Sequence, residues 1–274
     1  MIAYSPTETT DYLLCPQYRA YRWGGRWRAR VAGRMELGGI VGKGIHAGLA
    51  AHYRGQPAPD RVAYETTMAE LERLRGLGIA WEPALAPEAT SLPDKAAWGV
   101  QKFLTEPAPA WHVLAVEQRL GKGVVDLIAE DGVGPLVVDT KTTLKLESRY
   151  QASRLASYAT SWQLRDYCHR VSEYLERSVQ RATVQLIILG PVFRVIRHPL
   201  EFLDVERWLQ CWAWPVWQRM EADEDLGMPP RNLTVCHNTG HGYPCAFYGV
   251  CWEGRALEDV AVREPRRERE VADG

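Results

Sequence analysis

The sequence predicts an α/β fold in which helices precede a core of order β-β-β-α-β-β. Three short runs rich in β-branched residues and separated by glycine-containing turns are typical of a strand meander, and they cover residues 111–120, 123–130 and 135–143. A helical period then extends from Leu155 to about Gln180. Two further apolar runs, 182–190 and 192–200, flank Gly190-Pro191 and predict a hairpin.

The residues before this core predict mostly helix. Ser5 and Thr7 are candidate N-caps of a helix that continues to about Tyr21 and is interrupted at Cys15-Pro16. Residues 38–54 are predicted as a glycine-rich turn that leads into a helix carrying His46 and His52. Two further helices are expected at 60–76 and 94–105, joined by an irregular connector at 77–94.

The C-terminal part predicts one helix and one irregular region. Residues 201–222 form a helix whose tryptophans, Trp208 to Trp217, are expected to pack in the core, and 228–252 form a cysteine-rich loop region. The charged tail from Arg263 is expected to be disordered. We therefore expect one domain over 1–262, divided into a helical part (1–110), a core (111–200) and a C-terminal part (201–262), with a tail at 263–274.

Composition excludes several classes of protein. An apolar fraction of 46% and a charged fraction of 24% are those of a globular chain, and a net charge of −1 excludes a global positive field. There is no apolar run of about 18 residues and no signal-peptide pattern at the start, which predicts a cytoplasmic protein without a membrane partner. In that compartment six cysteines indicate metal or cluster ligation rather than disulfides.

Two acids and a lysine on adjacent predicted strands indicate a cation site. Asp126 interrupts one apolar strand and Asp139 follows another, so each carboxylate needs a compensating charge. Mg²⁺ or Mn²⁺ would supply it, because both ions prefer oxygen ligands. Lys141 leaves the same strand face as Asp139 and could orient or deprotonate a metal-bound water, which is chemistry for hydrolysing a phosphodiester. The plain alternative is a turn acid and a surface ion pair with Lys141.

These residues resemble the core of the PD-(D/E)XK nuclease superfamily, whose αβββαβ order and central mixed sheet flanked by helices would then apply. Gly42 to His46 is similar to the G-x-x-x-H motif of the RecB-like branch, and Gln163 to Tyr167 to its Q-x-x-x-Y motif. The resemblance implies the metal ligands His46, Asp126, Asp139 and the carbonyl of Thr140. It gives Lys141 a role on the water.

The same resemblance implies that Gln163 and Tyr167 support the catalytic site and touch the DNA backbone. Glu117, on the preceding strand, either faces this site or is exposed to solvent. A histidine in a helix is often structural, so the assignment of His46 as a metal ligand rests on its place in the order of the motifs.

Three grouped cysteines and one distant cysteine suggest a second metal centre. Cys236, Cys245 and Cys251 have the spacing C-x8-C-x5-C, and Cys15 is the candidate fourth ligand. This set resembles RecB-like nucleases of the CRISPR-associated and helicase–nuclease kinds, in which one cysteine before the core and three after it hold a [4Fe–4S] cluster. Zinc with His237 or His241, or ordinary thiols, are the alternatives. A cluster would staple the two ends of the chain together.

A basic aromatic stretch lies near the N-terminus. Between Tyr12 and Met35 there are six arginines and no acid, interleaved with tyrosine and tryptophan. Such residues contact phosphates and stack on unpaired bases, so we expect DNA contacts from Arg19, Arg22, Arg26 and Arg28. The alternative is an arginine network that holds the N-terminal segment to acidic neighbours.

The resemblance implies a hydrolase, an Mg²⁺- or Mn²⁺-dependent deoxyribonuclease that works as an exonuclease in DNA recombination, repair or phage DNA processing. Its partners would be DNA and a helicase, an annealing protein or a CRISPR adaptation protein. The alternatives are a DNA-binding module that does not cut and a scaffold with a structural metal centre.

Overall fold

A five-stranded mixed sheet forms the centre of the computed structural model, which describes residues 4–29, 31–32, 34–144, 148–225, 232, 245 and 247–264. The strands are β4 (His112–Leu120), β5 (Gly123–Asp131), β6 (Gly134–Thr143), β7 (Arg181–Leu189) and β8 (Phe193–Glu201). They lie side by side in this order, and only the β6–β7 pair within this sheet is parallel. The predicted β-β-β-α-β-β order and the mixed sheet are confirmed.

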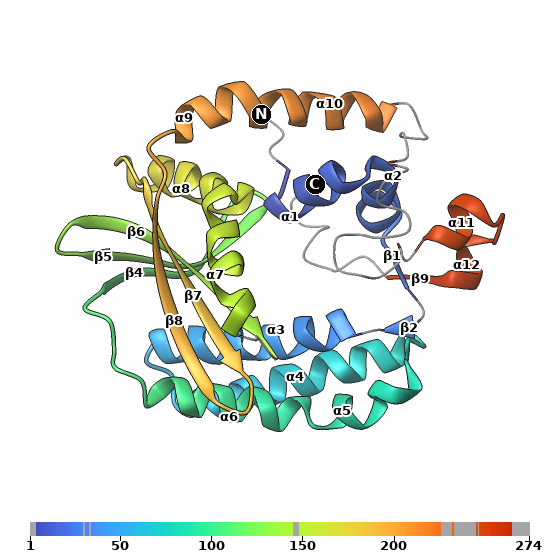
Figure 1. The fold of residues 1–274 in the computed structure, drawn as a ribbon, viewed down its shortest axis with the longest axis horizontal. Coiled ribbons are helices and arrows are strands. Elements are labelled where there is room, and N and C mark those ends of the chain that lie inside the picture. Colours follow the sequence, from blue (N-terminus) through green and yellow to red (C-terminus); the bar gives the residue numbers. More distant parts are fainter. Residues whose placement is uncertain are drawn as a thin grey trace.

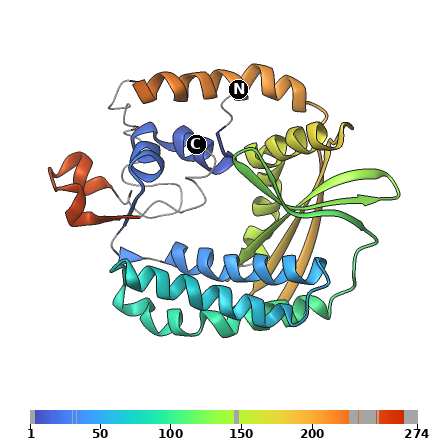
Figure 2. The same cartoon turned by 180° about the vertical axis from the view of Figure 1, so that it is seen from behind.

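Helices cover both faces of the sheet. On one face α3 (Arg34–Tyr53), α4 (Pro59–Gly76) and α6 (Leu92–Leu104) share a core with Ile187 and Leu189 of β7. On the other face α8 (Trp162–Leu175) packs against β5, β6 and β7. Figures 1 and 2 show the sheet at one side of the molecule, with α3 to α6 along one edge and α9 and α10 along the opposite edge. The predicted site residues Asp126, Asp139 and Lys141 lie on strands β5 and β6 of this sheet, between the helices that cover its two faces.

The glycine-rich segment is helical, so the predicted turn at its start is wrong. A Cβ at Gly44 would lie 2.7 Å from the carbonyl oxygen of Ala63, and one at Gly48 would lie 2.7 Å from that of Pro59. These glycines, four residues apart, allow α3 and α4 to pack with their backbones close together. Their cost in helix propensity, about 1 kcal/mol each, is offset by this close tertiary packing.

Two other predicted elements are divided differently. The expected connector contains β3 (Ala80–Trp81), a 3-10 turn (Pro83–Leu85) and α5 (Ala86–Thr90), and β3 pairs in parallel with β2 (Val31–Ala32). The single helix expected from Leu155 is instead α7 (Ser148–Ser157), a 3-10 turn (Tyr158–Thr160) and α8. Ser161 is extended and its hydroxyl accepts the N–H of Leu164, which starts a new helix.

The N-terminal and C-terminal helices pack on each other. The N-terminal elements are α1 (Pro6–Leu14), which Ser5 caps, α2 (Pro16–Arg19), a π-helical turn (Ala20–Gly24) and β1 (Trp27–Ala29). The C-terminal helix is divided into α9 (Val205–Trp208), a π-helical turn (Leu209–Ala213) and α10 (Trp214–Asp225). Trp208 and Trp217 are buried against Tyr4 and Tyr12, as predicted, whereas Trp212 is 64% exposed.

The chain after residue 247 forms α11 (Tyr248–Trp252), α12 (Leu257–Val260) and β9 (Ala261–Arg263). Arg263, where we expect the disordered tail to begin, instead pairs with Trp27 of β1, and the N–H of Glu264 donates to the carbonyl of Arg26. The rest of the predicted tail, 265–274, lies outside the described residues. Among the helices that the structure describes, none is both long enough and apolar enough to cross a bilayer.

Candidate active site

The two acids occupy neighbouring positions across strands β5 and β6. The antiparallel register pairs Leu127 with Val138, so the next positions outward are Asp126 and Asp139. Instead of continuing the ladder, the Asp126 carboxylate accepts the backbone N–H of Thr140, with Oδ2 2.7 Å from the nitrogen. Asp139 is 1% exposed, whereas Asp126 is half-buried. The strands therefore diverge where the carboxylates meet.

His46 reaches this point from helix α3. Its Nδ1 lies 3.4 Å from Oδ1 of Asp126. One turn earlier in the helix, a Cβ at Gly42 would lie 2.8 Å from the hydroxyl oxygen of Thr142, so a glycine lets α3 approach β6 closely. This contact gives the predicted G-x-x-x-H spacing a packing reason. Both residues serve to bring an imidazole to the strand.

Glu117 joins His46 and Asp126 from strand β4. The register pairs Val116 with Leu127 and Gln118 with Val125, which places Glu117 opposite Asp126. One potential ligand atom from each of His46, Glu117 and Asp126 lies within 4.8 Å of the others. Glu117 has a φ of 50°, a left-handed conformation that costs a residue with a side chain roughly 1–3 kcal/mol. Of the two possibilities left open for Glu117, the structure favours the one that faces the site.

Lys141 connects the acids to helix α8. Its Nζ lies 3.0 and 2.9 Å from the two oxygens of Asp139 and donates to Oε1 of Gln163 at 2.7 Å. Gln163 in turn donates through Nε2 to the hydroxyl oxygen of Tyr167 at 2.9 Å. Tyr167 is 5% exposed, so it is placed to hold Gln163 rather than to touch DNA directly. The side chains of the predicted Q-x-x-x-Y motif thus form a chain of contacts that ends at Lys141.

Burial and charge shift the titration of these groups. Burial raises the pKa of Asp139, opposed by Lys141 and reinforced by Asp126. Burial alone would lower the pKa of Lys141, but the Asp139 carboxylate raises it. Burial alone would raise the pKa of Asp126 and lower that of His46, yet their mutual attraction reverses both shifts. For Glu117, burial and then repulsion by Asp126 raise the pKa. The Asp126 carboxylate thus disfavours the charged forms of both Asp139 and Glu117.

The residues present fit a divalent cation. Oδ2 of Asp139 is buried and accepts no hydrogen bond among the described residues, although Lys141 Nζ lies 2.9 Å from it. The carboxylates of Glu117 and Asp126 lie close enough to the imidazole of His46 to share a cation, and Asp139 is next to them with both oxygens near Lys141. Such an oxygen-rich donor set suits Mg²⁺ or Mn²⁺. A bound cation would offset both the cost of burying these carboxylates and the repulsion that Asp126 exerts on Asp139 and Glu117.

Gln185 of β7 is a neighbour of this site that the sequence did not single out. It is fully buried and its Nε2 lies 3.4 Å from the hydroxyl oxygen of Thr140. Its other side-chain atom, Oε1, accepts from Nε of Arg197 at 3.4 Å. A glutamine within an apolar strand run was the available signal, but only the parallel pairing of β6 with β7 reveals its partner.

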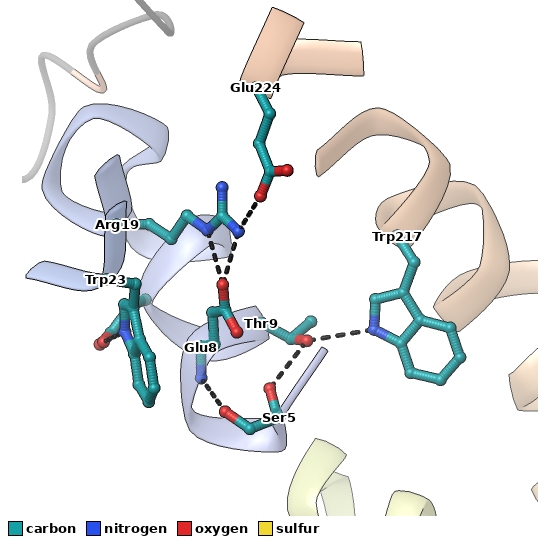
Figure 3. A network of polar contacts seen from close by, with 8 residues as sticks. Ser5, Glu8, Thr9, Arg19, Trp23, Trp217 and Glu224 are labelled. Carbon is teal, nitrogen blue, oxygen red and sulfur yellow. Dashed lines mark hydrogen bonds and ion pairs between the residues drawn. The ribbon is translucent and has the colours of Figure 1, made fainter. Parts of the chain in front are cut away.

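Arg19, predicted to contact DNA, lies in a buried ionic network (Figure 3). Its guanidinium donates to the carboxylates of Glu8 and Glu224, and its side chain is 10% exposed. Thr9, next to Glu8, accepts the indole N–H of Trp217 at 3.1 Å. For Arg19 the structure favours the arginine network over the DNA contact, because burial removes its donors from solvent.

The other predicted DNA-binding arginines lie farther along the same segment. Arg22 is 43% exposed and pairs with Asp11 at 2.9 Å. Arg28 pairs with Glu264 at 2.7 Å. Arg26 adopts a φ of 58° and its carbonyl oxygen receives the N–H of Glu264. Arg22 is the most exposed of the three, and both Arg22 and Arg28 already contact acids.

The cysteines are described only in part, because Cys236, His237 and His241 lie outside the described residues. Cys15 is buried, and the backbone N–H of Asn232 donates to its Sγ at 3.4 Å. The ring of Phe247, two residues after Cys245, makes tilted contacts with the rings of Tyr18 and Tyr21, with centroids 5.7 and 4.9 Å away. The C-terminal segment that carries Cys245 therefore returns to the helix that follows Cys15. Cys168 is buried as predicted, whereas Cys211, also expected in the core, is exposed.

Comparison with known proteins gives a family match. A family model described as the PD-(D/E)XK nuclease superfamily matches residues 3–251. No curated protein matches the chain. A solved structure of SfsA from Pyrococcus furiosus in complex with Ca²⁺ is 17% identical with a TM-score of 0.17, and the match covers 39% of this chain and 62% of that one.

Proposed function

Because the chain belongs to the PD-(D/E)XK nuclease superfamily, we propose that it is an Mg²⁺- or Mn²⁺-dependent deoxyribonuclease of the RecB-like branch. One observation carries the proposal. Strands β5 and β6 bring Asp126 and Asp139 to adjacent positions, with His46 on one side and Lys141 on the other. This is the combination that metal-assisted hydrolysis of a phosphodiester requires.

The proposed ligands of the cation are His46, Asp126, Asp139 and the carbonyl of Thr140, with Glu117 as a further ligand. The hydrogen bond from Thr140 N–H occupies Oδ2 of Asp126 and directs Oδ1 toward His46. When bound, the cation polarises the scissile phosphate and lowers the pKa of a water molecule. Ligands on β4, β5, β6 and α3 would hold that cation on rigid elements.

The proposed role of Lys141 is to orient the attacking water and to stabilise negative charge on the phosphate. Gln163 fixes the position of the ammonium group, since its Oε1 lies 2.7 Å from Nζ. Tyr167 fixes Gln163 in turn and is buried, so we assign it a positioning role. The exposed Arg22 and the partly exposed Arg26 and Arg28 of the N-terminal segment would hold the phosphate backbone.

An exonuclease that acts at DNA ends, in recombination, repair or phage DNA processing, is the more specific form of the proposal. It is supported by the G-x-x-x-H and Q-x-x-x-Y spacings, whose residues the structure places around Lys141 and Asp126. A helicase, an annealing protein or a CRISPR adaptation protein would be its partner.

We also propose a [4Fe–4S] cluster held by Cys15, Cys236, Cys245 and Cys251. The position of Asn232 beside Cys15, and of Phe247 beside Tyr18, supports it because both ends of the chain meet there. The cluster would close a long loop and stabilise the fold by a few kcal/mol, on the order of 3–5.

A cleavage assay with matched lysine variants tests the nuclease. The purified protein is incubated with end-labelled linear DNA and with closed circular DNA, in Mg²⁺ or Mn²⁺ and in EDTA. Lys141→Ala should lose activity, whereas Lys102→Ala, an exposed lysine on α6, should cut like the parent. Activity on linear DNA alone supports an exonuclease. DNA binding without any cutting would replace the proposal with a binding module.

Purification without oxygen tests the cluster separately. The proposal expects a brown protein with about four iron atoms per chain, and Cys15→Ser should lose most of that iron. A colourless protein with one bound zinc ion would contradict the cluster and leave the nuclease site unaffected.

A further inference from the structure

A pocket of about 570 Å³ lies beside the N-terminal half of α3. Helix α2, the π-helical turn after it and strand β1 form one side of it, and α3 forms another. Glu70 of α4, Phe247 and Glu264 also line it. Its volume is within the range of roughly 300–1,000 Å³ that is usual for sites of small ligands. None of the ligands assigned above to the cation lines this pocket.

Aromatic rings supply much of the lining. Tyr18, Trp23, Trp27 and Phe247 all contribute to it, and Trp23 keeps 36% of its surface exposed. The Trp23 indole is held in place because its Nε1 donates to Asp11 at 2.7 Å. The Arg22 guanidinium lies 5.9 Å from the same ring. A ring fixed at its edge and partly exposed is suited to stack on a flat ligand.

The charged groups of the pocket carry both signs. Arg22, Arg26, Arg28 and Lys43 are accompanied by Glu36, Glu70 and Glu264. Glu70 binds Lys43, and Glu264 binds Arg28. A surface for phosphates alone would not include three carboxylates, because they repel an anion. The edge of a nucleobase, by contrast, presents both donors to carboxylates and acceptors to arginine or lysine.

Helix α3 joins the pocket to the candidate active site. Gly39, Ile40 and Lys43 line the pocket, and His46 follows Lys43 by three residues. Three residues correspond to about 4.5 Å along a helix axis, so Lys43 of the pocket lies within one helical turn of His46, a proposed cation ligand. A strand held at the active site would bring a neighbouring nucleotide to this position.

We infer that the pocket takes up one unpaired nucleobase of the DNA strand whose backbone is cut, a subsite that rests on the proposed function. The base stacks on Trp23 while arginines and carboxylates contact its edge. Bases within a duplex are already stacked and paired, so entry requires a single strand or an opened end. The enzyme therefore holds single-stranded DNA through a base as well as through phosphates.

Two substitutions at Trp23 separate stacking from structure. Trp23→Phe and Trp23→Leu both lose the hydrogen bond to Asp11, but only phenylalanine keeps an aromatic face. Binding is measured by fluorescence anisotropy in EDTA, with a single-stranded thymidine oligonucleotide and an abasic strand of the same length. Circular dichroism checks that both variants fold.

Trp23→Leu should bind the thymidine strand about 5- to 150-fold more weakly than Trp23→Phe, the range that loss of one base–aromatic stack gives. On the abasic strand both variants should bind alike. Equal affinities of the two variants for the thymidine strand, or a loss that is as large on the abasic strand, would overturn the inference. If the two variants differ on the thymidine strand as expected but the parent protein cuts no DNA, the proposed nuclease function is contradicted and the inferred base-binding pocket still stands.

Discussion

Glu117 is expected to destabilise the protein without metal and to stabilise it with metal. Its left-handed backbone costs roughly 1–3 kcal/mol, and Asp126 repels its charge. Glu117→Gln removes the charge but keeps the backbone strain. Glu117→Gly removes both the charge and the strain, because glycine adopts a positive φ without a steric cost. Glycine loses about 0.5–1 kcal/mol through its larger unfolded-state entropy. The net gain for Glu117→Gly in EDTA is therefore about 1 kcal/mol.

Thermal unfolding in EDTA and in Mn²⁺ measures this exchange. For a chain of this size about 1 kcal/mol corresponds to roughly 2–4 °C, so in EDTA the midpoints should rise from parent to Glu117→Gln to Glu117→Gly. In saturating Mn²⁺ a tenfold loss of affinity removes about 1.4 kcal/mol from a variant, so the parent should then be the most stable of the three. The parent therefore moves from the lowest midpoint of the three in EDTA to the highest in Mn²⁺.

Glu65→Gln, an exposed glutamate on α4, is the control and should follow the parent in both conditions. If Mn²⁺ raises the midpoint of Glu117→Gln as much as that of the parent, Glu117 does not bind the cation. If Glu117→Gly melts below the parent in EDTA, the strain assigned to its backbone is wrong.

Three other predictions concern packing and ion pairs elsewhere in the fold. Arg19→Met should lower the free energy of unfolding by about 3–5 kcal/mol in urea titrations, since it breaks a buried ion pair, whereas Arg61→Met, at a fully exposed ion pair, should leave the urea midpoint close to that of the parent; a stable Arg19→Met with weaker DNA binding would contradict the network. Gly44→Ala should lower the melting midpoint by several degrees, because overpacking costs about 1–3 kcal/mol, while Gly38→Ala on the same helix has open space and should not destabilise. Burial would raise the pKa of Glu70, but two cationic neighbours lower it to about 2, so its carboxylate contributes stability above its usual pKa of 4.5 and loses it as pH falls toward 2; the stability advantage of the parent over Glu70→Gln should shrink across that window, and a constant difference would contradict the ion pair.

The core was predictable because its signals are local. The apolar run that Asp126 interrupts and the one that Asp139 follows are strand patterns with charges where apolar residues would be expected, and the structure places both acids in the sheet. The motif spacings around His46 and Gln163 were also readable, since each spans about one helical turn. These signals do not depend on which elements pack together.

Features that depend on tertiary contacts were not predictable. The glycines of α3 resemble a turn in sequence, and only the approach of α4 to Gly44 and Gly48 explains their helical state. From the sequence alone Arg19 is a candidate for contacting DNA, and only the structure shows that it binds Glu224, about 200 residues away in the chain. Glu117 itself has a strained backbone at the position opposite Asp126, and no local sequence pattern reveals that this residue faces the site.

The most direct test of the proposed nuclease is metal-dependent DNA cleavage by the parent and by Asp139→Asn, with Asp131→Asn as the matched control. Asp131 lies at the far end of β5 and pairs with Arg181, away from His46. The parent and Asp131→Asn should cut DNA in Mg²⁺ or Mn²⁺ and not in EDTA, while Asp139→Asn should fold and bind DNA without cutting it. Cleavage by Asp139→Asn at the rate of the parent would contradict the proposed site.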